Sequence, residues 1–115
     1  MTAVSALLFD VFGTVVNWRE GISRDVATIA DKHSVALNAT AFADSWRAQY
    51  QPSMEEVRTG RRAFTILDVL HRENLKKVAL DKGLPDLSNE DEDFLVTAWH
   101  RLPGWPDSSE GLLRL

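Results

Sequence analysis

The sequence predicts an α/β fold in which one buried strand is followed by a run of amphipathic helices. The strand is predicted by residues 6–9, which are apolar and precede a single carboxylate at Asp10. Strands inside a parallel sheet have this character, because they are buried on both faces. The helices are predicted by apolar residues that recur at helical spacing from Gly21 onward, with charged residues between them.

The predicted strand ends in three residues that can carry chemistry. We expect Asp10 at the carboxyl edge of the strand, where ligands bind in open α/β sheets, because a carboxylate is costly inside a buried sheet. Gly13 allows a sharp turn, and Thr14 can hydrogen-bond to the turn or to the Asp10 carboxylate. From the residues alone, Asp10 is either a nucleophile or a residue that only closes the strand.

The first two helices are predicted by their caps and apolar stripes. After a polar connection at residues 17–20, Gly21 opens the first helix, whose apolar positions are Ile22, Val26, Ile29 and Ala30. Either Asn38 or Thr40 can cap the second helix, because a short polar side chain accepts a hydrogen bond from the first turn. Its apolar stripe consists of Phe42, Trp46 and Tyr50, with Ala43 beside it.

Proline and glycine divide the next segment. Pro52 is predicted to interrupt the second helix and leave only a short turn before Gly60. A long third helix then begins at Phe64 and ends near residues 83–85, in the sequence Gly-Leu-Pro. Its apolar positions are Phe64, Leu67, Leu70 or His71, Leu75 and Val78.

Two capping signals predict the last helices. Ser88 with Asp91 three residues later resembles a capping box, and it precedes the fourth helix. The apolar positions of that helix are Phe94, Leu95, Ala98, Trp99 and Leu102. Residues 103–106 form a stiff linker, after which Asp107, with Glu110 three residues on, is predicted to cap a fifth helix.

A single buried strand needs partners for its backbone groups. A strand of this type requires parallel neighbours, and a right-handed crossover helix normally leads to the next one. We therefore expect the 115 residues to be the first part of a larger protein. Alternatively, the strand can pair with the same strand of a second copy of the chain, and the protein would then be a homodimer.

The stretch Phe9-Asp10-Val11-Phe12-Gly13-Thr14-Val15 resembles the first motif of the haloacid dehalogenase superfamily. The resemblance makes Asp10 the catalytic nucleophile. Phosphatases of that superfamily place a second Asp two residues after the first, whereas this chain has Phe12. An aromatic residue there resembles the type II 2-haloacid dehalogenases, in which it helps to line an apolar pocket. Because Phe12 cannot move a proton, it also disfavours phosphomonoester hydrolysis on chemical grounds.

The resemblance implies a Rossmann-like three-layer core with an inserted helical cap. Residues 1–16 would supply the first core strand and the nucleophile motif, and residues 17–102 the helical cap. Residues 103–115 would be the linker and the start of the helix that returns to the core. This layout covers all 115 residues but roughly half of such a protein. The Ser or Thr motif, the Lys motif and the last acidic motif of the family would follow Leu115.

The function implied by the resemblance is hydrolytic dehalogenation of short 2-haloalkanoic acids through an ester on Asp10. Thr14 would position Asp10, while Phe12 and Tyr50 would contact the substrate, a small halogenated carboxylic acid. No metal or organic cofactor is implied. The alternatives are a magnesium-dependent phosphatase of the same superfamily and a non-catalytic helical module that binds a partner chain. We expect the 115-residue chain alone to be inactive.

Arg47 is the candidate partner of the nucleophile. The resemblance places a Trp-Arg pair on the second cap helix, where Trp46 and Arg47 stand, and there the Arg contacts the leaving halide or the substrate carboxylate. Arg suits this role because it stays cationic and presents a planar fork of donors. The alternative is a surface Arg that pairs with Asp44 or lies over the aromatic stripe.

Composition excludes several other classes of function. The net charge is −4 and the thirteen Lys and Arg are scattered, so we expect neither a nucleic-acid nor a membrane partner. No apolar run reaches the ~20 residues of a membrane span, and no signal peptide is recognisable. The absence of Cys excludes disulfides and thiolate metal sites and fits a cytoplasmic protein.

The remaining polar and aromatic residues receive structural interpretations. His33, His71 and His100 share no metal-ligand spacing and are predicted to lie at helix surfaces or ends. The acidic run at residues 90–93 lies in the first turn of a predicted helix, where it complements the helix dipole without a metal. Packing anchors between cap and core are predicted at Trp18, Trp99 and Trp105.

Overall fold

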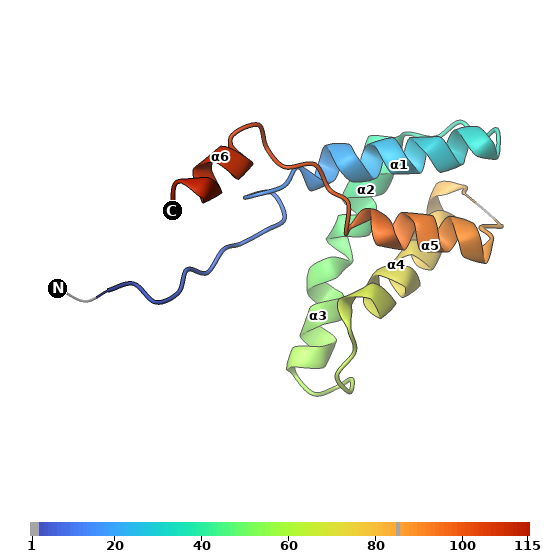
Figure 1. Ribbon diagram of the computed structural model, residues 1–115. Helices are drawn as coiled ribbons and strands as arrows, with labels where there is room; N and C mark the ends of the chain where they lie inside the picture. The colour runs from blue at the N-terminus through green and yellow to red at the C-terminus, as the bar shows by residue number, and fades with distance from the viewer. Residues whose placement is uncertain (1–2, 85) are drawn as a thin grey trace.

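The helical prediction is confirmed by a computed structural model that describes residues 3–84 and 86–115. The helices are α1 (Trp18–Lys32), α2 (Ala39–Ala48), α3 (Tyr50–Arg58), α4 (Leu67–Lys82), α5 (Asn89–Ala98) and α6 (Ser108–Leu113). In Figure 1, α1, α2, α4 and α5 gather into a bundle, while α3 and the start of α4 project from it as an arm. The N-terminal segment and α6 lie together on one side of the bundle (Figure 1).

The core of the bundle forms where the apolar stripes of four helices meet. Helix α1 packs on α2 and α5, and α4 packs on the same two helices. The largest fully buried side chains are Trp46, Phe42, Ile22, Leu75, Leu84, Leu95 and Val26. Every predicted apolar position of the first helix is in this core, because one stripe at helical spacing faces both neighbouring helices.

Local caps set where the helices begin. The Asn17 side chain accepts a hydrogen bond from the Glu20 backbone, so α1 starts at Trp18 rather than at Gly21. Asn38, one of the two predicted caps of α2, accepts a hydrogen bond from the Ala41 backbone. These bonds satisfy backbone N–H groups that have no partner within their own helix.

Three further boundaries follow the sequence signals closely. The predicted capping box is present: Asp91 N–H donates to Ser88 Oγ at 3.0 Å, and the Asp91 carboxylate accepts from the Ser88 backbone. Gly83 ends α4 with a left-handed φ of 81°, as expected of a C-terminal glycine. The last residue of the predicted Gly-Leu-Pro terminator, Pro85, lies outside the described residues. Asp107 precedes α6 as predicted, but its side chain makes no capping bond.

The predicted interruption at Pro52 is wrong. Only Gln49 separates α2 from α3, and Pro52 is the third residue of α3. Its missing N–H costs nothing there, because the first turn of a helix has no intrahelical acceptor for that group. The predicted start at Phe64 is also wrong: its side chain is 84% exposed, and α4 begins at Leu67.

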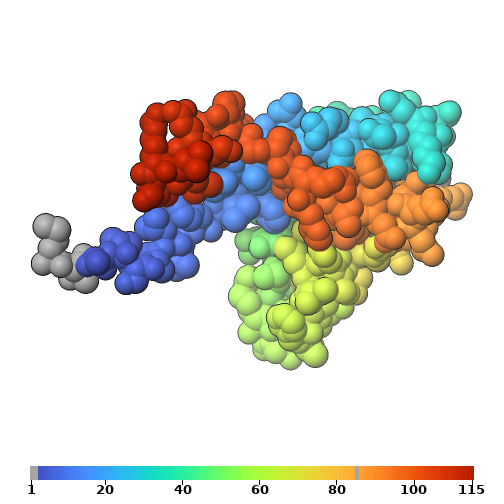
Figure 2. Space-filling view, viewed as in Figure 1, coloured from blue at the N-terminus to red at the C-terminus, as the bar shows by residue number. Residues whose placement is uncertain are grey.

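The predicted strand is not formed. Residues 3–11 run as an extended segment that projects away from the bundle (Figures 1 and 2), and the described residues contain only isolated β-bridges. Leu8 is 98% exposed, and Leu7, Phe9 and Val11 are also exposed. The reason is physical: a strand needs a neighbour for its N–H and C=O groups, and the described residues offer none. The Rossmann-like core is therefore not observed in them.

The chain enters and leaves the helical bundle at one point. Val16 and Gly104 form an antiparallel bridge. Next to it, the Asn17 N–H donates to the Pro103 carbonyl at 2.8 Å, and the Trp105 N–H donates to the Val15 carbonyl at 3.1 Å. The two passages thus lie side by side, which is the arrangement that an inserted cap at residues 17–102 would require. We name residues 15–17 and 103–105 the neck.

Gly21 packs against the neck so closely that a larger side chain there should lower the stability of the protein. A Cβ at this position would lie 2.8 Å from Pro103 Cδ and 3.0 Å from Leu102 Cδ2. Because both neighbours are packed, we expect Gly21→Ala to lower the free energy of unfolding by about 1–3 kcal/mol. Chemical denaturation followed by circular dichroism measures this change. Gly111→Ala is the control, since a Cβ there meets nothing within 4 Å. Equal stabilities of the two variants would contradict the prediction.

Candidate active site

The acidic residue of the first motif is held by the turn that follows it. Thr14 Oγ1 donates a hydrogen bond of 2.5 Å to Asp10 Oδ2, which is one of the two bonds expected for this threonine. The turn closes through bonds from the Gly13 N–H to the Val16 carbonyl and from the Val15 N–H to the Val11 carbonyl, both at 2.9 Å. Gly13 has a φ of +90°, which explains why glycine stands here. The Asp10 carboxylate is therefore oriented, and its residue is exposed to solvent.

Arg47 of α2 lies among aromatic rings. Its Cζ atom is 4.1 Å from the centre of the Tyr50 ring, 5.2 Å from that of Phe12 and 5.8 Å from that of Trp18. Such distances are those of cation–π contacts. The structure thus brings together Arg47, Tyr50 of α3 and Phe12, which stands two residues after Asp10.

The ion pair between Arg47 and Asp44 that the alternative interpretation suggested is absent. Asp44 accepts two hydrogen bonds of 2.8 Å from Arg19 instead. The hydrogen bond from Arg19 also lowers the pKa of the Asp44 carboxyl. The other suggestion, that Arg47 lies over the aromatic stripe, agrees with the structure.

The charge of Arg47 has no counter-ion among the described residues. Within residues 3–84 and 86–115 no carboxylate comes within 4 Å of it, and its buried Nη1 atom has no hydrogen-bond partner. Arg47 as a whole is half-buried, and removing part of a cation from water without a partner costs free energy. A guanidinium of this kind attracts an anion, above all one that presents two acceptors side by side.

Phe12 attaches the motif to the helical bundle. Its ring centre lies 5.3 Å from that of Trp99 and 6.4 Å from that of Tyr50. Trp99 in turn stacks on Trp18 at 6.2 Å. Trp18 and Trp99 thus pack on each other, and Trp99 packs against a residue of the motif itself. Their predicted position between cap and core stays a prediction. The aromatic rings make the side of the site next to Arg47 apolar, which strengthens electrostatic contacts there.

His71 belongs to the same cluster, although we predicted it at a helix surface. It is only 3% exposed, and its ring stacks on Trp99 with the centres 4.6 Å apart. The prediction was wrong because α4 is covered by α2 and α5 together, which buries Leu70 and His71 alike. The sequence indicated this burial only ambiguously, because the apolar stripe of the predicted helix could run through either Leu70 or His71. Burial lowers the pKa of His71 to about 4, so its ring is neutral at pH 7.

The buried His71 predicts a pH-dependent stability. Its pKa is about 4 when folded and near 6.5 when unfolded, so between these values only the unfolded chain takes up the proton. Stability should therefore decrease as the pH falls from 6.5 to 4, by about 3 kcal/mol in total. We expect His71→Phe to remove most of this dependence in urea titrations at several pH values. His100→Gln should retain it, since His100 is exposed. An unchanged dependence in His71→Phe would refute the assignment to His71.

Two further ion pairs link neighbouring segments of the bundle. Asp91, which is 2% exposed, accepts hydrogen bonds from Lys32 Nζ at 2.6 Å and His33 Nε2 at 2.7 Å. These bonds, led by that from Lys32, hold the pKa of Asp91 well below its ordinary value. His100 pairs with Asp68 at 2.8 Å. The dipole interpretation of the acidic run is thus incomplete, because Asp91 also links α5 to the end of α1.

Neither a metal cluster nor a membrane span is found in the described part of the chain. No three His, Asp or Glu side chains gather there as metal ligands would. No helix there combines the length and the apolar character needed to cross a membrane.

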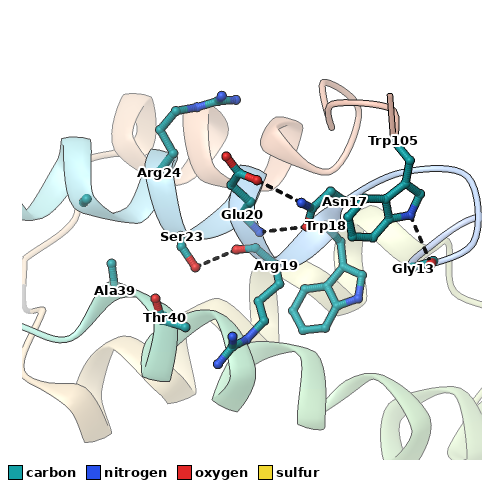
Figure 3. A pocket seen from close by; sticks show the side chains of 11 residues that line it. Gly13, Asn17, Trp18, Arg19, Glu20, Ser23, Arg24, Ala39, Thr40 and Trp105 are labelled. Atoms are coloured by element: carbon teal, nitrogen blue, oxygen red, sulfur yellow. Dashed lines mark hydrogen bonds between the residues drawn. The ribbon is translucent and has the colours of Figure 1, made fainter. Parts of the chain in front are cut away.

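An open groove of about 810 Å³ lies beside the turn that follows Asp10. Figure 3 shows the side chains that line it, with Trp18, Trp105 and the backbone of Gly13 at one end and Ala39 and Thr40 on α2. Trp105 was predicted as a packing anchor. Its residue is 37% exposed, and its Nε1 donates to the Gly13 carbonyl at 3.1 Å.

Comparison with known proteins finds similar solved structures. The crystal structure of a defluorinating L-2-haloacid dehalogenase is 48% identical, with a TM-score of 0.84, over 90% of this chain and 43% of that one. The crystal structure of an L-2-haloacid dehalogenase is 34% identical, with a TM-score of 0.77, over 86% of this chain and 42% of that one. A third, described as a dehalogenase, is 23% identical, with a TM-score of 0.65, over 96% and 46% of the two chains, and shows a likeness of fold.

The remaining comparisons give no match. No protein-family model and no curated protein matches the chain. The chain spans less than half the length of the solved structures to which it is similar.

Proposed function

This chain belongs to the haloacid dehalogenase superfamily, with L-2-haloacid dehalogenases among its relatives, and we propose that it supplies the nucleophile and the helical cap of such an enzyme. The substrates would be short 2-haloalkanoic acids. We propose the L enantiomers, because the two dehalogenases that are 48% and 34% identical to this chain are named for them. The carbon–halogen bond would be hydrolysed without transfer of a phosphoryl group.

The observation that supports this proposal best is the surroundings of Arg47. Its guanidinium has no counter-ion among the described residues, and it contacts Phe12, which belongs to the same motif as Asp10. A 2-haloacid offers this cation two anionic groups, the carboxylate and the departing halide. The aromatic rings of Phe12 and Tyr50 suit the apolar carbon chain between them.

In the proposed reaction, a carboxylate oxygen of Asp10 attacks C2 of the substrate from the side opposite the halogen. The new C–O bond forms as the C–halogen bond breaks, and the halide leaves with the bonding electron pair. The configuration at C2 is inverted, and the acid is bound to Asp10 as an ester. Water then attacks the carbonyl carbon of that ester. This step releases the 2-hydroxy acid and one proton and restores the Asp10 carboxylate.

Each remaining residue has a role in this scheme. Thr14 fixes the Asp10 carboxylate through its hydrogen bond of 2.5 Å, so that one oxygen is aimed at the substrate. Arg47 stabilises the departing halide or orients the substrate carboxylate. Phe12 and Tyr50 keep water away from the carbon under attack.

A second function, binding of a partner chain without catalysis, is supported by the exposed apolar segment. Leu7, Leu8, Phe9 and Val11 are exposed, and such a segment tends to pair with another chain. This function would require neither Asp10 nor Arg47. Variants of these two residues therefore separate the two functions.

Halide release tests the proposal. L-2-chloropropionate, its D enantiomer and fluoroacetate would be incubated with this chain and with a longer chain that carries the remainder of the dehalogenase core. We expect the longer chain to release halide from the L substrate. The 115-residue chain alone should be inactive, since residues 3–11 form no sheet. If the longer chain releases no halide from any of these acids, the proposal fails.

Removal of metal ions separates dehalogenation from phosphatase chemistry. Because Phe12 stands where a phosphatase has its second carboxylate, the first motif offers a single carboxylate, that of Asp10, and no pair of carboxylates to hold magnesium. We expect halide release by the longer chain to continue in excess chelator, as followed with a halide-sensitive electrode. Loss of activity in chelator and its recovery with Mg²⁺ would favour the phosphatase alternative instead.

A further inference from the structure

The turn after Asp10 is bonded to the segment that leaves the helical bundle. Ser108 Oγ donates to the Val15 carbonyl at 2.5 Å, and the Trp105 N–H donates to the same carbonyl at 3.1 Å. The Trp105 indole donates to the Gly13 carbonyl at 3.1 Å, a bond drawn in Figure 3. The two side-chain donors stand 92 and 93 residues further along the chain than their acceptors.

These bonds support the turn from outside, together with the packing of Phe12 on the helical bundle. On its N-terminal side, residues 3–11 pair with no strand among the described residues. Within the turn, Gly13 has a left-handed φ, a conformation that glycine leaves easily. The donors from Trp105 and Ser108 therefore supply much of the rigidity that the turn does not have of itself.

We propose that Trp105 and Ser108 are positioning residues for Asp10. Acting through the carbonyls of Gly13 and Val15, they keep the turn in the conformation that sets Thr14 Oγ1 against the Asp10 carboxylate. This inference rests on the proposed function, in which Asp10 is the nucleophile. A nucleophile that must attack in line with the leaving group is sensitive to small errors of orientation. The exit segment of the helical region thus takes part in aligning the reaction.

Amide hydrogen exchange in the 115-residue chain tests this inference without any turnover. Ser108→Ala and Trp105→Phe each remove one side-chain donor and keep most of the packing. We expect the N–H groups of Gly13 and Val16 to exchange about tenfold faster, as the loss of one hydrogen bond implies. Ser109→Ala is the matched control on the same helix, because the Ser109 hydroxyl has no hydrogen-bond partner among the described residues. Ser108→Thr should restore slow exchange.

Two outcomes would overturn the inference. One is unchanged exchange at Gly13 and Val16 in both variants, and the other is equal acceleration in Ser109→Ala. The amide of Leu95 serves as an internal reference, since it lies in the core of the bundle. If it accelerates equally, the variants have loosened the whole bundle and the inference fails.

Steady-state kinetics of the longer chain distinguish a positioning role from a purely structural one, because only a positioning role should lower kcat without changing KM. We expect Ser108→Ala and Trp105→Phe to lower kcat about tenfold with KM nearly unchanged, because neither residue is assigned a substrate contact. A rise in KM at constant kcat would contradict positioning of Asp10. Failure of the proposed function is distinguishable: the longer chain would then release no halide, or Asp10→Asn would release it as fast as the parent, whatever the exchange rates at Gly13 and Val16 show.

Discussion

Replacing Asp10 by Asn should lower halide release by at least about a thousandfold in the longer chain, while the helical bundle stays folded. An amide oxygen is a much weaker nucleophile than a carboxylate, and no second carboxylate stands in the motif to replace it. Asp10 is also exposed, so the substitution removes little packing. Single-turnover halide release measures the loss, and circular dichroism verifies the fold.

Isotope labelling tests the covalent step separately. After one turnover in water enriched in heavy oxygen, the label should be found in the Asp10 carboxylate, because water attacks the carbonyl carbon of the ester. Peptide mass analysis locates it. Label that enters only the hydroxy acid in the first turnover would show that water attacks C2 directly, and the ester mechanism would be wrong. Asp107→Asn is a matched control. Asp107 directly precedes α6, but its exposed carboxylate makes no capping hydrogen bond.

Local features of the fold could be predicted because their physics is contained in a few neighbouring residues. The Ser88–Asp91 capping box and the Asn38 cap depend on side chains three residues from their partners. The hydrogen bond from Thr14 to Asp10 spans four residues and belongs to the same class. Gly83 ends α4 because a left-handed residue is needed at that one position.

The features that could not be predicted depend on contacts between distant segments. Arg47 has no counter-ion because Asp44 is bonded by Arg19, which lies 25 residues before Asp44. His71 is buried because two other helices cover α4, and no local pattern distinguishes it from Leu70. The apolar run at residues 6–9 does favour a strand, but a strand also requires a neighbour, which the described residues do not supply.

Pro52 shows a different reason why a helix boundary could not be predicted from the sequence. The rule that proline breaks a helix holds for the interior of the helix, and Pro52 lies in the first turn of α3. The boundary at Gln49 could not be recognised in the sequence, because apolar residues continue at helical spacing from Phe42 through Trp46 to Tyr50. The helix boundary therefore depends on the direction in which α3 leaves the bundle, which is set by its packing on α2 and α4.

The second large effect is expected at Arg47. Replacing it by Lys keeps the positive charge but removes the planar fork of donors and its stacking on Tyr50. We expect kcat/KM for L-2-chloropropionate to fall at least about a hundredfold in the longer chain, because the point charge of Lys cannot bind two acceptors side by side. Arg47→Leu should fall further, since it also removes the charge.

The matched control for Arg47 is Arg58→Lys on α3. Unlike Arg47, which has no counter-ion among the described residues, Arg58 has one: its guanidinium donates to Glu55 on the surface, at 2.7 and 2.9 Å. A surface ion pair of this kind contributes little to stability, and nothing connects it to the aromatic cluster. Activity close to that of the parent chain is therefore expected for Arg58→Lys. If Arg47→Lys were equally active, the guanidinium of Arg47 would have no specific task, and its aromatic surroundings would serve packing alone.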